Sequence, residues 1–375
     1  MTSFAPRSLI AASLLLCALP ASGATLTATA ATFAAVFASV KSGDTIKLSG
    51  TFGLTKLSDR TFAKAVTIDA TKAVFTDTLS INNVNGLSFV GGEYGSSSVA
   101  THYGKAVAVS GGSNIFFAKA IVVGAATGQG ISFEDSTTVG VRDSTFTGLH
   151  AGVSMSGVTD GSVYMNKSIG AVSDGFDVAG SHNVRVRANS CSGTSPSAGA
   201  HADCVQLWSI LGKPVQSDIL IMDNTATGNT QGFTSFTPAN GGGLRISIIG
   251  NHLNTAFPQG IACYGCVDST ITGNTVMTAV GAAHKTSINV VGGSNNTVAS
   301  NTFGYSSASS TVASTFTAVA TRSLVTARIA NTGLEGVSPQ SAVPEPDVWA
   351  MMVVGFGAMG IAMRRRNRPT RSVAA

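Results

Sequence analysis

The sequence predicts an all-β solenoid, in which short strands and turns wind into coils that stack along one axis. Three observations lead to this prediction. A phrase of alternating apolar residues ending in Asn recurs through the chain, its strands are rich in Val and Ile with a period of two, and Gly, Asn and Ser rather than helical stretches separate them. A unit of this kind cannot bury its apolar face alone, so neighbouring units must stack.

The recurring Asn residues mark the period of the coil. Phrases such as Val184–Asn189, Ile219–Asn224 and Ile246–Asn251 follow one another, and the Asn positions are 166, 189, 224, 251, 274 and 301. Each Asn would lie at the same bend of its coil. We therefore expect a column of amides that satisfies the backbone of the bends and hydrogen-bonds along the axis.

Residues 1–24 have the pattern of a secretory signal peptide. Arg7 precedes the apolar run Leu9–Leu19, and the small residues Ser22 and Ala24 stand at the expected cleavage positions. The sequence therefore predicts export.

The solenoid itself is predicted over residues 25–331 and opens with a short helix. Phe33, Val36, Phe37 and Val40 have the spacing of one helical stripe, which ends near Gly43. We expect this helix to cover the open N-terminal end of the apolar core.

Residues 332–343 are predicted to be a linker, and residues 344–368 contain three parts in order. Pro344, Glu345 and Pro346 come first, an apolar stretch follows over 348–363, and an arginine cluster begins at Arg364. The segment resembles a PEP-CTERM sorting signal. The resemblance implies a Gram-negative bacterium, cleavage by an exosortase-type enzyme near Pro-Glu-Pro, and a hydrophobic helix that holds the chain in the membrane before processing, with the arginines inside. A plain C-terminal anchor without cleavage is the alternative.

Much of the net charge of +5 arises from the ends of the chain. Six of the 23 basic residues, Arg7 and the five arginines from Arg364 to Arg371, lie outside the predicted solenoid, as do three of the 18 acidic residues, Glu335, Glu345 and Asp347. The solenoid is therefore close to neutral. We expect no nucleic-acid partner.

Four cysteines remain after removal of the signal peptide. In an oxidising compartment, Cys191 with Cys204 would staple the insertion between them, and Cys263 with Cys266 would close a turn. A zinc site built from the two pairs is the alternative, although the pairs lie about two coils apart along the predicted axis.

A second strand of each coil carries the candidate catalytic residues. When the copies are aligned, Asp174 and Asp203 share one column, Asp177 lies in the outward column beside them, and His201 comes just before Asp203. Because adjacent coils stand about 4.8 Å apart, these side chains should converge. Crowded carboxylates repel one another, so one can act as a general acid beside an ionised partner, or the three aspartates can hold Ca²⁺. Alternatively, Asp174 and Asp203 only cap turns.

Candidate substrate-binding residues lie on two strands of the coil. Gln206 belongs to the outward column of Asp177, and Trp208, Phe236 and Tyr264 form an apolar column on which sugar rings can stack or which a loop covers. On the strand that ends at Asn, Arg185 and Arg187 point outward. They would bind the carboxylates of a polyanionic substrate, or they are solvated surface residues.

The repeats and the N-terminal segment resemble the right-handed parallel β-helix family, which includes pectate lyases, polygalacturonases, alginate lyases and mannuronan C5-epimerases. The resemblance covers roughly residues 30–331 and implies a single-stranded right-handed parallel β-helix with an N-terminal capping helix. His201–Asp203 and Asp174–Asp177 look like the acid-rich turns of these enzymes. The Gly-His-Gly and Arg-Ile-Lys signatures of polygalacturonases and the Asp-Pro-His-Asp motif of the epimerases are missing, so no catalytic role is carried over from one subfamily.

The sequence thus predicts an exported protein of the periplasm, outer surface or extracellular matrix that acts on a polysaccharide. Lyase or glycoside hydrolase chemistry would take place in a groove at Asp174, Asp177, His201 and Asp203. No cofactor is certain, and Ca²⁺ is the candidate. The alternative is a non-catalytic matrix protein or carbohydrate-binding adhesin.

Overall fold

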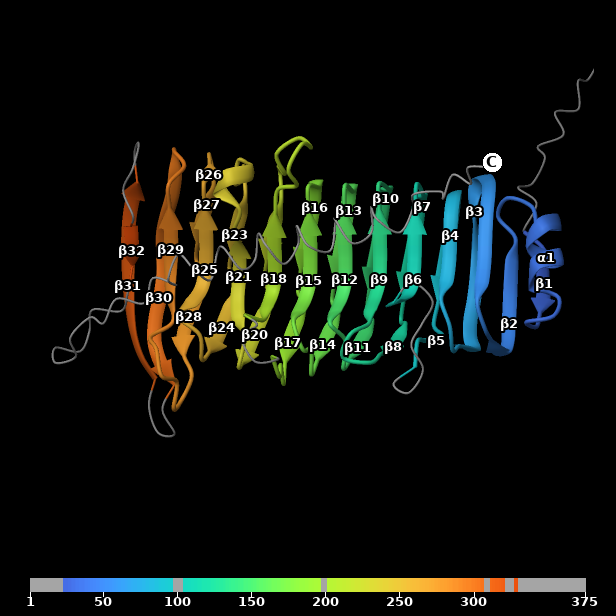
Figure 1. Cartoon of the computed structure of the whole chain (residues 1–375), viewed down its shortest axis with the longest axis horizontal. Coiled ribbons are helices and arrows are strands. Elements are labelled where there is room, and N and C mark those ends of the chain that lie inside the picture. Colours follow the sequence, from blue (N-terminus) through green and yellow to red (C-terminus); the bar gives the residue numbers. More distant parts are fainter. Residues whose placement is uncertain (1–22, 97–103, 197–200, 307–310, 321–326, 330–375) are drawn as a thin grey trace, which may run out of the picture. The chain divides into compact units, whose positions relative to one another are not determined.

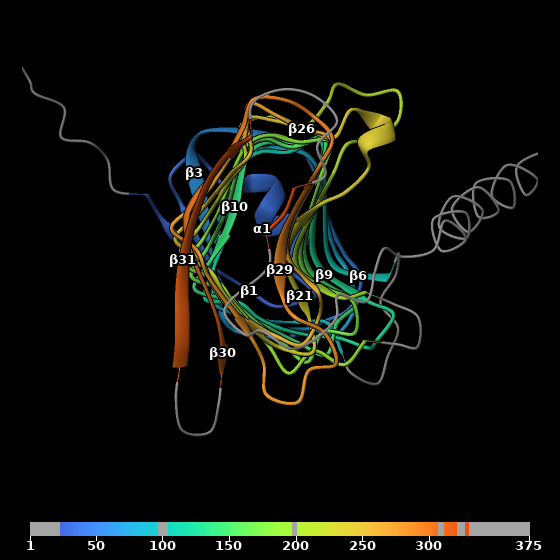
Figure 2. The ribbon, with the colours of Figure 1, turned by 90° about the vertical axis from the view of Figure 1, so that its left-hand side faces the viewer.

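The computed structural model describes residues 23–96, 104–196, 201–306, 311–320 and 327–329. Its fold is an all-β parallel solenoid of about 11 turns, as the sequence predicts (Figure 1). In the middle of the stack each coil contributes one strand to each of three faces, which we call sheets A, B and C. Viewed along the axis, β10 of sheet B lies on the left, and β9 and β21 of sheet A lie on the right (Figure 2).

All neighbours within each sheet pair in parallel. Sheet A contains β6 (Lys105–Ser110), β9 (Gln129–Glu134), β12 (Ala151–Ser156), β15 (Asp174–Ala179), β18 (Asp203–Trp208), β21 (Gln231–Ser235), β25 (Gln259–Tyr264) and β29 (Ser287–Val291). Sheet B contains β7 (Ser113–Ala118), β10 (Thr137–Arg142), β13 (Thr159–Tyr164), β16 (His182–Arg187), β19 (Leu220–Met222), β23 (Ser247–Ile249), β27 (Thr270–Thr272) and β30 (Asn296–Ser306). Sheet C contains β5 (Glu93–Tyr94), β8 (Ile121–Val123), β11 (Thr145–Thr147), β14 (Lys167–Ile169), β17 (Ser190–Ser192), β20 (Thr225–Gly228), β24 (His252–Thr255) and β28 (Thr275–Thr278).

The two ends of the stack differ from the middle. The N-terminal end holds β1 (Thr25–Ala28), α1 (Phe33–Ser39), β2 (Thr45–Phe52) and the long bent strands β3 (Thr55–Phe75) and β4 (Leu79–Val90). At the other end, β31 (Thr311–Ala320) and β32 (Ala327–Ile329) pair antiparallel with β30 and β29. Near this end, 3-10 helix η2 (Pro238–Asn240) precedes the small pair of β22 (Gly243–Leu244) and β26 (Cys266–Val267).

Helix α1 occupies the stretch for which the helical stripe predicts a helix, and it lies within the outline of the coils (Figure 2). Phe33 and Phe37 are its buried residues. The Phe33 ring packs edge-on against Phe52, and the Phe37 ring against Phe62. The guanidinium of Arg60 donates hydrogen bonds to the backbone carbonyls at the C-terminal end of the helix. The role of helix α1 as a cover for the N-terminal end of the apolar core stays a prediction.

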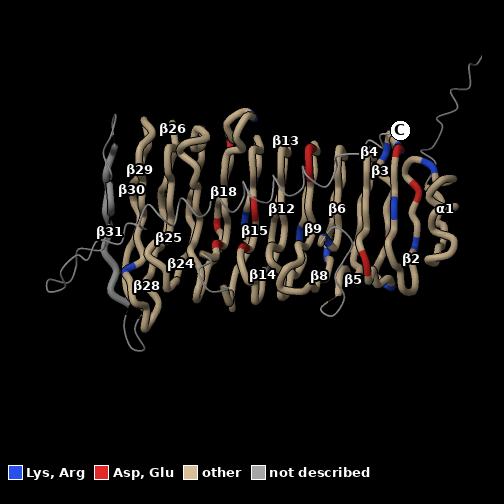
Figure 3. Tube along the Cα trace, in the orientation of Figure 1, with Lys and Arg blue, Asp and Glu red and all other residues tan. Residues whose placement is uncertain are grey.

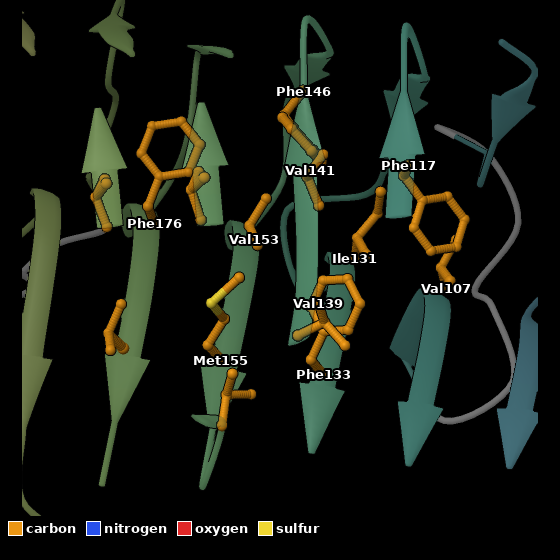
Figure 4. Close-up of a cluster of buried hydrophobic side chains, with 14 of the residues drawn as sticks. Val107, Phe117, Ile131, Phe133, Val139, Val141, Phe146, Val153, Met155 and Phe176 are labelled. Carbon is orange, nitrogen blue, oxygen red and sulfur yellow. The ribbon is translucent and has the colours of Figure 1, made fainter. Parts of the chain in front are cut away.

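The core runs the length of the stack because every strand turns alternate side chains inward. Figure 4 shows this packing around Phe117, Phe133 and Phe176, whose rings point into the coil between Val and Ile side chains. All three of these residues are at most 1% exposed. Aromatic rings on successive coils also stack, with 4.6 Å between the centroids of Phe89 and Phe117.

The predicted amide column is present at the bend between sheets B and C. The column consists of Asn166, Asn189, Asn224, Asn251, Asn274 and Asn301. Each amide NH₂ donates to a backbone carbonyl of an earlier coil, and each except that of Asn301 also donates to the carboxamide oxygen of the next Asn. The same oxygen accepts the backbone N–H of the preceding Asn, for example at 2.9 Å between Asn189 N and Asn224 Oδ1. All six residues are buried. The ladder thus fixes the register of the coils.

Several predicted segments lie outside the described residues. These are the signal peptide up to residue 22, the linker at 332–343 and the sorting segment at 344–368, with its apolar stretch. Within the part of the chain that the structure describes, no helix is long and apolar enough to cross a membrane. The boundaries drawn at residues 24, 331 and 343 stay predictions.

We expect Asn224→Ala to destabilise the solenoid by about 3 kcal/mol or more, because it leaves buried donors of Asn189 and the carbonyl of Val186 without partners. The check is the guanidinium midpoint of unfolding. The control is Asn82→Ala, since Asn82 is exposed and its side chain bonds only to Ser80 among the described residues. Equal losses in the two variants would contradict a structural role for the ladder.

Candidate functional site

The four predicted catalytic side chains converge on the outer face of sheet A. In the register of the strands, Ser154 of β12 pairs with Asp177 of β15, which pairs with Gln206 of β18. Asp174 and Asp203 open β15 and β18, and the backbone N–H of Asp203 donates to Asp174 Oδ1 at 2.8 Å. The stacking of coils therefore places residues 29 positions apart side by side. Elsewhere the charged residues are scattered along the solenoid and are most frequent in the N-terminal coils (Figure 3).

Asp203 is the most enclosed member of the cluster, with a side chain that is 0% exposed. Its Oδ1 accepts a hydrogen bond from the Thr234 hydroxyl at 3.0 Å, and its Oδ2 lies 3.4 Å from His201 Nδ1. The imidazole of His201 remains 26% exposed. His201 thus joins a buried carboxylate to the surface.

Asp174 and Asp177 differ in how their oxygens are satisfied. Both oxygens of Asp174 accept hydrogen bonds, one from the backbone N–H of Asp203 and the other from the Ser173 hydroxyl at 2.9 Å. Asp177 Oδ2 accepts a long bond from Ser154 at 3.4 Å, and its buried Oδ1 has no partner within the described residues. A buried oxygen without a donor disfavours the ionised carboxylate.

The pKa values of the cluster follow from this burial. Desolvation, followed by the charge of Asp203, raises the pKa of Asp174 to about 7. Burial and the charges of Asp174 and Asp203 raise the pKa of Asp177 well above its usual range. Burial also raises the pKa of Asp203, against the opposing hydrogen bond and charge of His201. The hydrogen bond to Asp203 raises the pKa of His201 in turn. The cluster therefore holds protons at neutral pH, as general acid catalysis requires.

Calcium binding by Asp174, Asp177 and Asp203 stays a prediction. Both oxygens of Asp174 and both oxygens of Asp203 already face donors of the protein. Among the described residues, no group of three or more His, Cys, Asp and Glu side chains is arranged to hold a metal ion. Calcium sites require several oxygens that point toward one shared centre.

The aromatic column is only partly open to solvent, because its middle residue, Phe236, is buried. Phe236 is only 7% exposed, and its ring packs edge-on against Tyr264 at 5.3 Å and against His201 at 5.8 Å. The hydroxyl of Tyr264 reaches back along its own strand to Gln259 Oε1 at 2.9 Å. These rings cover the sheet on the C-terminal side of the carboxylates. Trp208 and Gln206 remain partly exposed on β18.

The two arginines predicted to bind substrate do not join the cluster. Arg185 and Arg187 lie on β16 of sheet B, whereas the carboxylates lie on β15 and β18 of sheet A. Sheets A and B lie on opposite sides of the coil (Figure 2). Lys213 of the insertion after Trp208 forms an exposed ion pair with Asp135 at 3.1 Å. The alignment of repeats placed each side chain in a column, but it contained no information about the angle between the sheets.

Both predicted cysteine pairs form disulfide bonds, which leaves no thiolates for the alternative zinc site. Cys191 of β17 bonds to Cys204 of β18, and Cys263 bonds to Cys266. The first bridge lies beneath the cluster, because Cys204 follows Asp203 directly. A Cβ atom on Gly175 would stand only 2.6 Å from Cys191 Sγ, so a glycine is needed for the bridge to pass under β15. The bridge thus holds the start of β18 in place.

Three polar residues that the sequence did not single out belong to the site. Thr234 and Ser173 donate to the carboxylates, and Gln231 follows Asp203 in register with a buried Oε1 that lacks a hydrogen bond within the described residues. Thr234 and Gln231 stand in the same columns as Asp177 and Asp203. Their place in these columns is the sequence feature that could have identified them, although Thr and Gln are too common in solenoid turns to mark a site alone.

A scan against protein families matches residues 342–366 to the PEP-CTERM protein-sorting motif. The matched residues include Pro344, Glu345 and Pro346, and the motif indicates export in a Gram-negative bacterium and processing by an exosortase. The chain is therefore a parallel β-helix protein that carries a PEP-CTERM sorting signal.

Comparison with solved structures finds the same fold in polysaccharide enzymes. An alginate lyase from Paenibacillus sp. is 15% identical over 69% of this chain and 96% of its own, with a TM-score of 0.54. The A-module of a mannuronan C-5 epimerase from Azotobacter vinelandii is 13% identical over 74% of this chain and 82% of its own, with a TM-score of 0.53. Identities this low show the fold alone. A search of curated proteins finds no match.

We expect Asp174→Asn to gain stability relative to the wild type as the pH rises from 4 to 8. The pKa of Asp174 is about 7 in the folded protein against 3.8 for the ordinary group. The wild type therefore has the full contribution of this group below pH 3.8 and loses it as the pH rises through 7, whereas Asn does not titrate. Melting temperatures of both proteins across this range provide the check.

Asp69→Asn is the matched control, because the Thr71 hydroxyl lowers the pKa of Asp69. The contribution of Asp69 to the stability of the fold is present above pH 3.8 and is lost as the pH falls. The melting temperature of this variant should therefore drop relative to the wild type as the pH rises from 2.5 to 5. Parallel pH curves for wild type and Asp174→Asn would contradict the raised pKa of Asp174.

Proposed function

We propose that the protein hydrolyses glycosidic bonds of a neutral polysaccharide at the carboxylate cluster of sheet A. The observation that carries the proposal is the separation of charges. Three buried carboxyl groups lie together on sheet A, and the arginines of the middle coils lie on sheet B. Glycoside hydrolysis needs two carboxyl groups with different protonation states and needs no cation.

A uronate lyase would need more positive charge at the site. In β-elimination a cation must neutralise the uronate carboxylate and the negative charge that develops beside it. The strands of sheet A from β6 to β29 contain one basic residue, Lys105, whose ammonium lies 3.9 Å from Glu134. The imidazole of His201 faces Asp203. The balance of charge therefore favours a substrate without carboxylates.

The three aspartates take different parts in the proposed reaction. Asp174 is protonated below pH 7 and donates its proton to the oxygen of the leaving sugar. Asp203, whose ionised form is stabilised by His201 and Thr234 against the larger effect of burial, acts as the base or nucleophile. Asp177, the carboxyl group with an unpartnered buried oxygen, holds a further proton and hydrogen-bonds the sugar beside the scissile bond. Gln206, next to Asp177 in register, and Trp208 border the sugar on β18.

Export places the protein where polysaccharides are found. We infer that residues 1–24 are removed as a signal peptide and that the apolar stretch of 344–368 holds the chain in the membrane until an exosortase cuts near Pro344–Pro346. The protein would then act in the periplasm, on the outer surface or in the extracellular matrix. The names of the solved alginate lyase and mannuronan epimerase support a polysaccharide as substrate. The charge distribution favours a neutral polymer over a uronate.

We expect the purified protein to release reducing ends from a neutral polysaccharide, without unsaturated uronates, when it is incubated with a panel of neutral and acidic polymers. Asp174→Asn and Asp203→Asn should each lose at least about a hundredfold in kcat/KM, as for loss of a general acid or base. Asp218→Asn, an exposed aspartate that pairs with Arg245, is the control and should retain activity. Unsaturated products would show a lyase, and glycan binding without any product would show an adhesin.

The rate should fall as the pH rises above 7, because Asp174 then loses the proton that it donates. A plot of kcat/KM against pH on the active glycan measures this fall. The His201→Gln variant should shift the other limb of the profile, since it removes the positive partner of Asp203. A profile that stays level to pH 9 would exclude Asp174 as the general acid.

A further inference from the structure

The outer face of sheet B carries exposed aromatic rings among arginines. In the register of β10, β13 and β16, Arg142 pairs with Tyr164, which pairs with Arg187. Tyr164 thus stands between two arginines of neighbouring coils in the register of the strands, and the residue is 40% exposed. A solenoid with so few charged residues, only 11% of the chain, would not collect cations on one face by its composition alone.

Beside the first column lies a second one, which has small residues in its middle and a large side chain at each end. Phe116 of β7 pairs with Gly140, which pairs with Ser162, which pairs with Arg185. The ring of Phe116 leans over Gly140, because a Cβ atom there would meet Phe116 Cδ1 at 3.4 Å. Phe116 is 40% exposed. The column thus offers a flat ring, then two small residues, then a guanidinium.

Within the described residues, two of the three arginines on this face have guanidinium donors without a close hydrogen-bond or ion-pair partner. Arg185 is exposed and takes part there in no hydrogen bond or ion pair. Arg187 reaches Asp223 only at 4.0 Å, and its buried Nε has no hydrogen-bond acceptor. Arg142 is paired with Asp143 at 2.6 Å. Two guanidinium groups two residues apart on one strand are therefore available for an anion.

We propose that this face of sheet B, formed by Phe116, Arg142, Tyr164, Arg185 and Arg187, binds an acidic polysaccharide whose sugars carry carboxylates. Guanidinium forks bind carboxylates through paired hydrogen bonds, and exposed rings offer flat apolar surface to the C–H faces of sugars.

This second site differs from the carboxylate cluster in place and in charge. It lies on the opposite side of the coil from β9 and β21 (Figure 2). A chain bound there cannot reach Asp174 or Asp203 with the same sugars. The site would retain the protein on an anionic polymer while the cluster on sheet A remains open to another glycan. It does not rest on the proposed hydrolysis.

The test is binding of sodium alginate to the full solenoid, measured by affinity electrophoresis and titration calorimetry, with neutral dextran as the reference polymer. We expect alginate but not dextran to bind, with affinity that falls as salt is raised. Arg185→Gln with Arg187→Gln should weaken binding at least tenfold. Tyr164→Ala alone should weaken it several-fold without a change in charge.

Arg245→Gln is the matched control, since Arg245 is an exposed arginine beside sheet B that is held by Asp218 through two hydrogen bonds. It should leave alginate binding unchanged. Equal losses in the control and in the double variant would show unspecific attraction and overturn the site. So would absence of alginate binding by the wild type, or a loss of binding in Asp203→Asn equal to that of the double variant. Melting temperatures of all variants exclude unfolding as the cause.

Discussion

The register between coils is the constraint on which the rest of the molecule depends. A parallel solenoid has no local turn that pins one strand to the next, so slippage must be prevented by groups that repeat once per coil. The amide ladder performs this task, since each Asn donates to a strand carbonyl and each except the last, Asn301, also donates to the next Asn. The residue before each Asn adopts a positive φ, as at Met165, Ala188 and Asp223, so the bend has one geometry throughout.

Because the register is fixed, residues that are far apart along the chain become neighbours in space. Asp174 and Asp203 become adjacent although a coil separates them, while Arg185 stands on another side of the coil from Asp177 although only a few residues lie between them. Each coil therefore distributes chemistry among three faces. The buried carboxylates collect on sheet A and the arginines of the middle coils on sheet B, which is why we propose glycans of different charge for the two surfaces.

Burial of three carboxyl groups costs folding free energy, and the surrounding structure must offset it. The long apolar core and the ladder stabilise the coils independently of the site. The disulfide between Cys191 and Cys204 anchors the start of β18 directly beside Asp203. Phe236 excludes water from one side of the cluster and packs against His201. Pre-organised, poorly solvated groups of this kind are typical of sites that transfer protons.

The sequence by itself determined the coil, the ladder, the cysteine pairs and the gathering of Asp174, Asp177, His201 and Asp203. Each of these depends on a residue that recurs at a fixed place in a stacked repeat, and stacking turns such recurrence into contact. Only the tertiary structure decided that the strand of Arg185 and Arg187 lies on another face than the carboxylates, that Phe236 is buried against His201, and that Asp177 has a buried oxygen without a donor among the described residues. The physical reason is that the angles between sheets and the tilt of side chains arise from packing between coils, which a pattern along one chain does not contain.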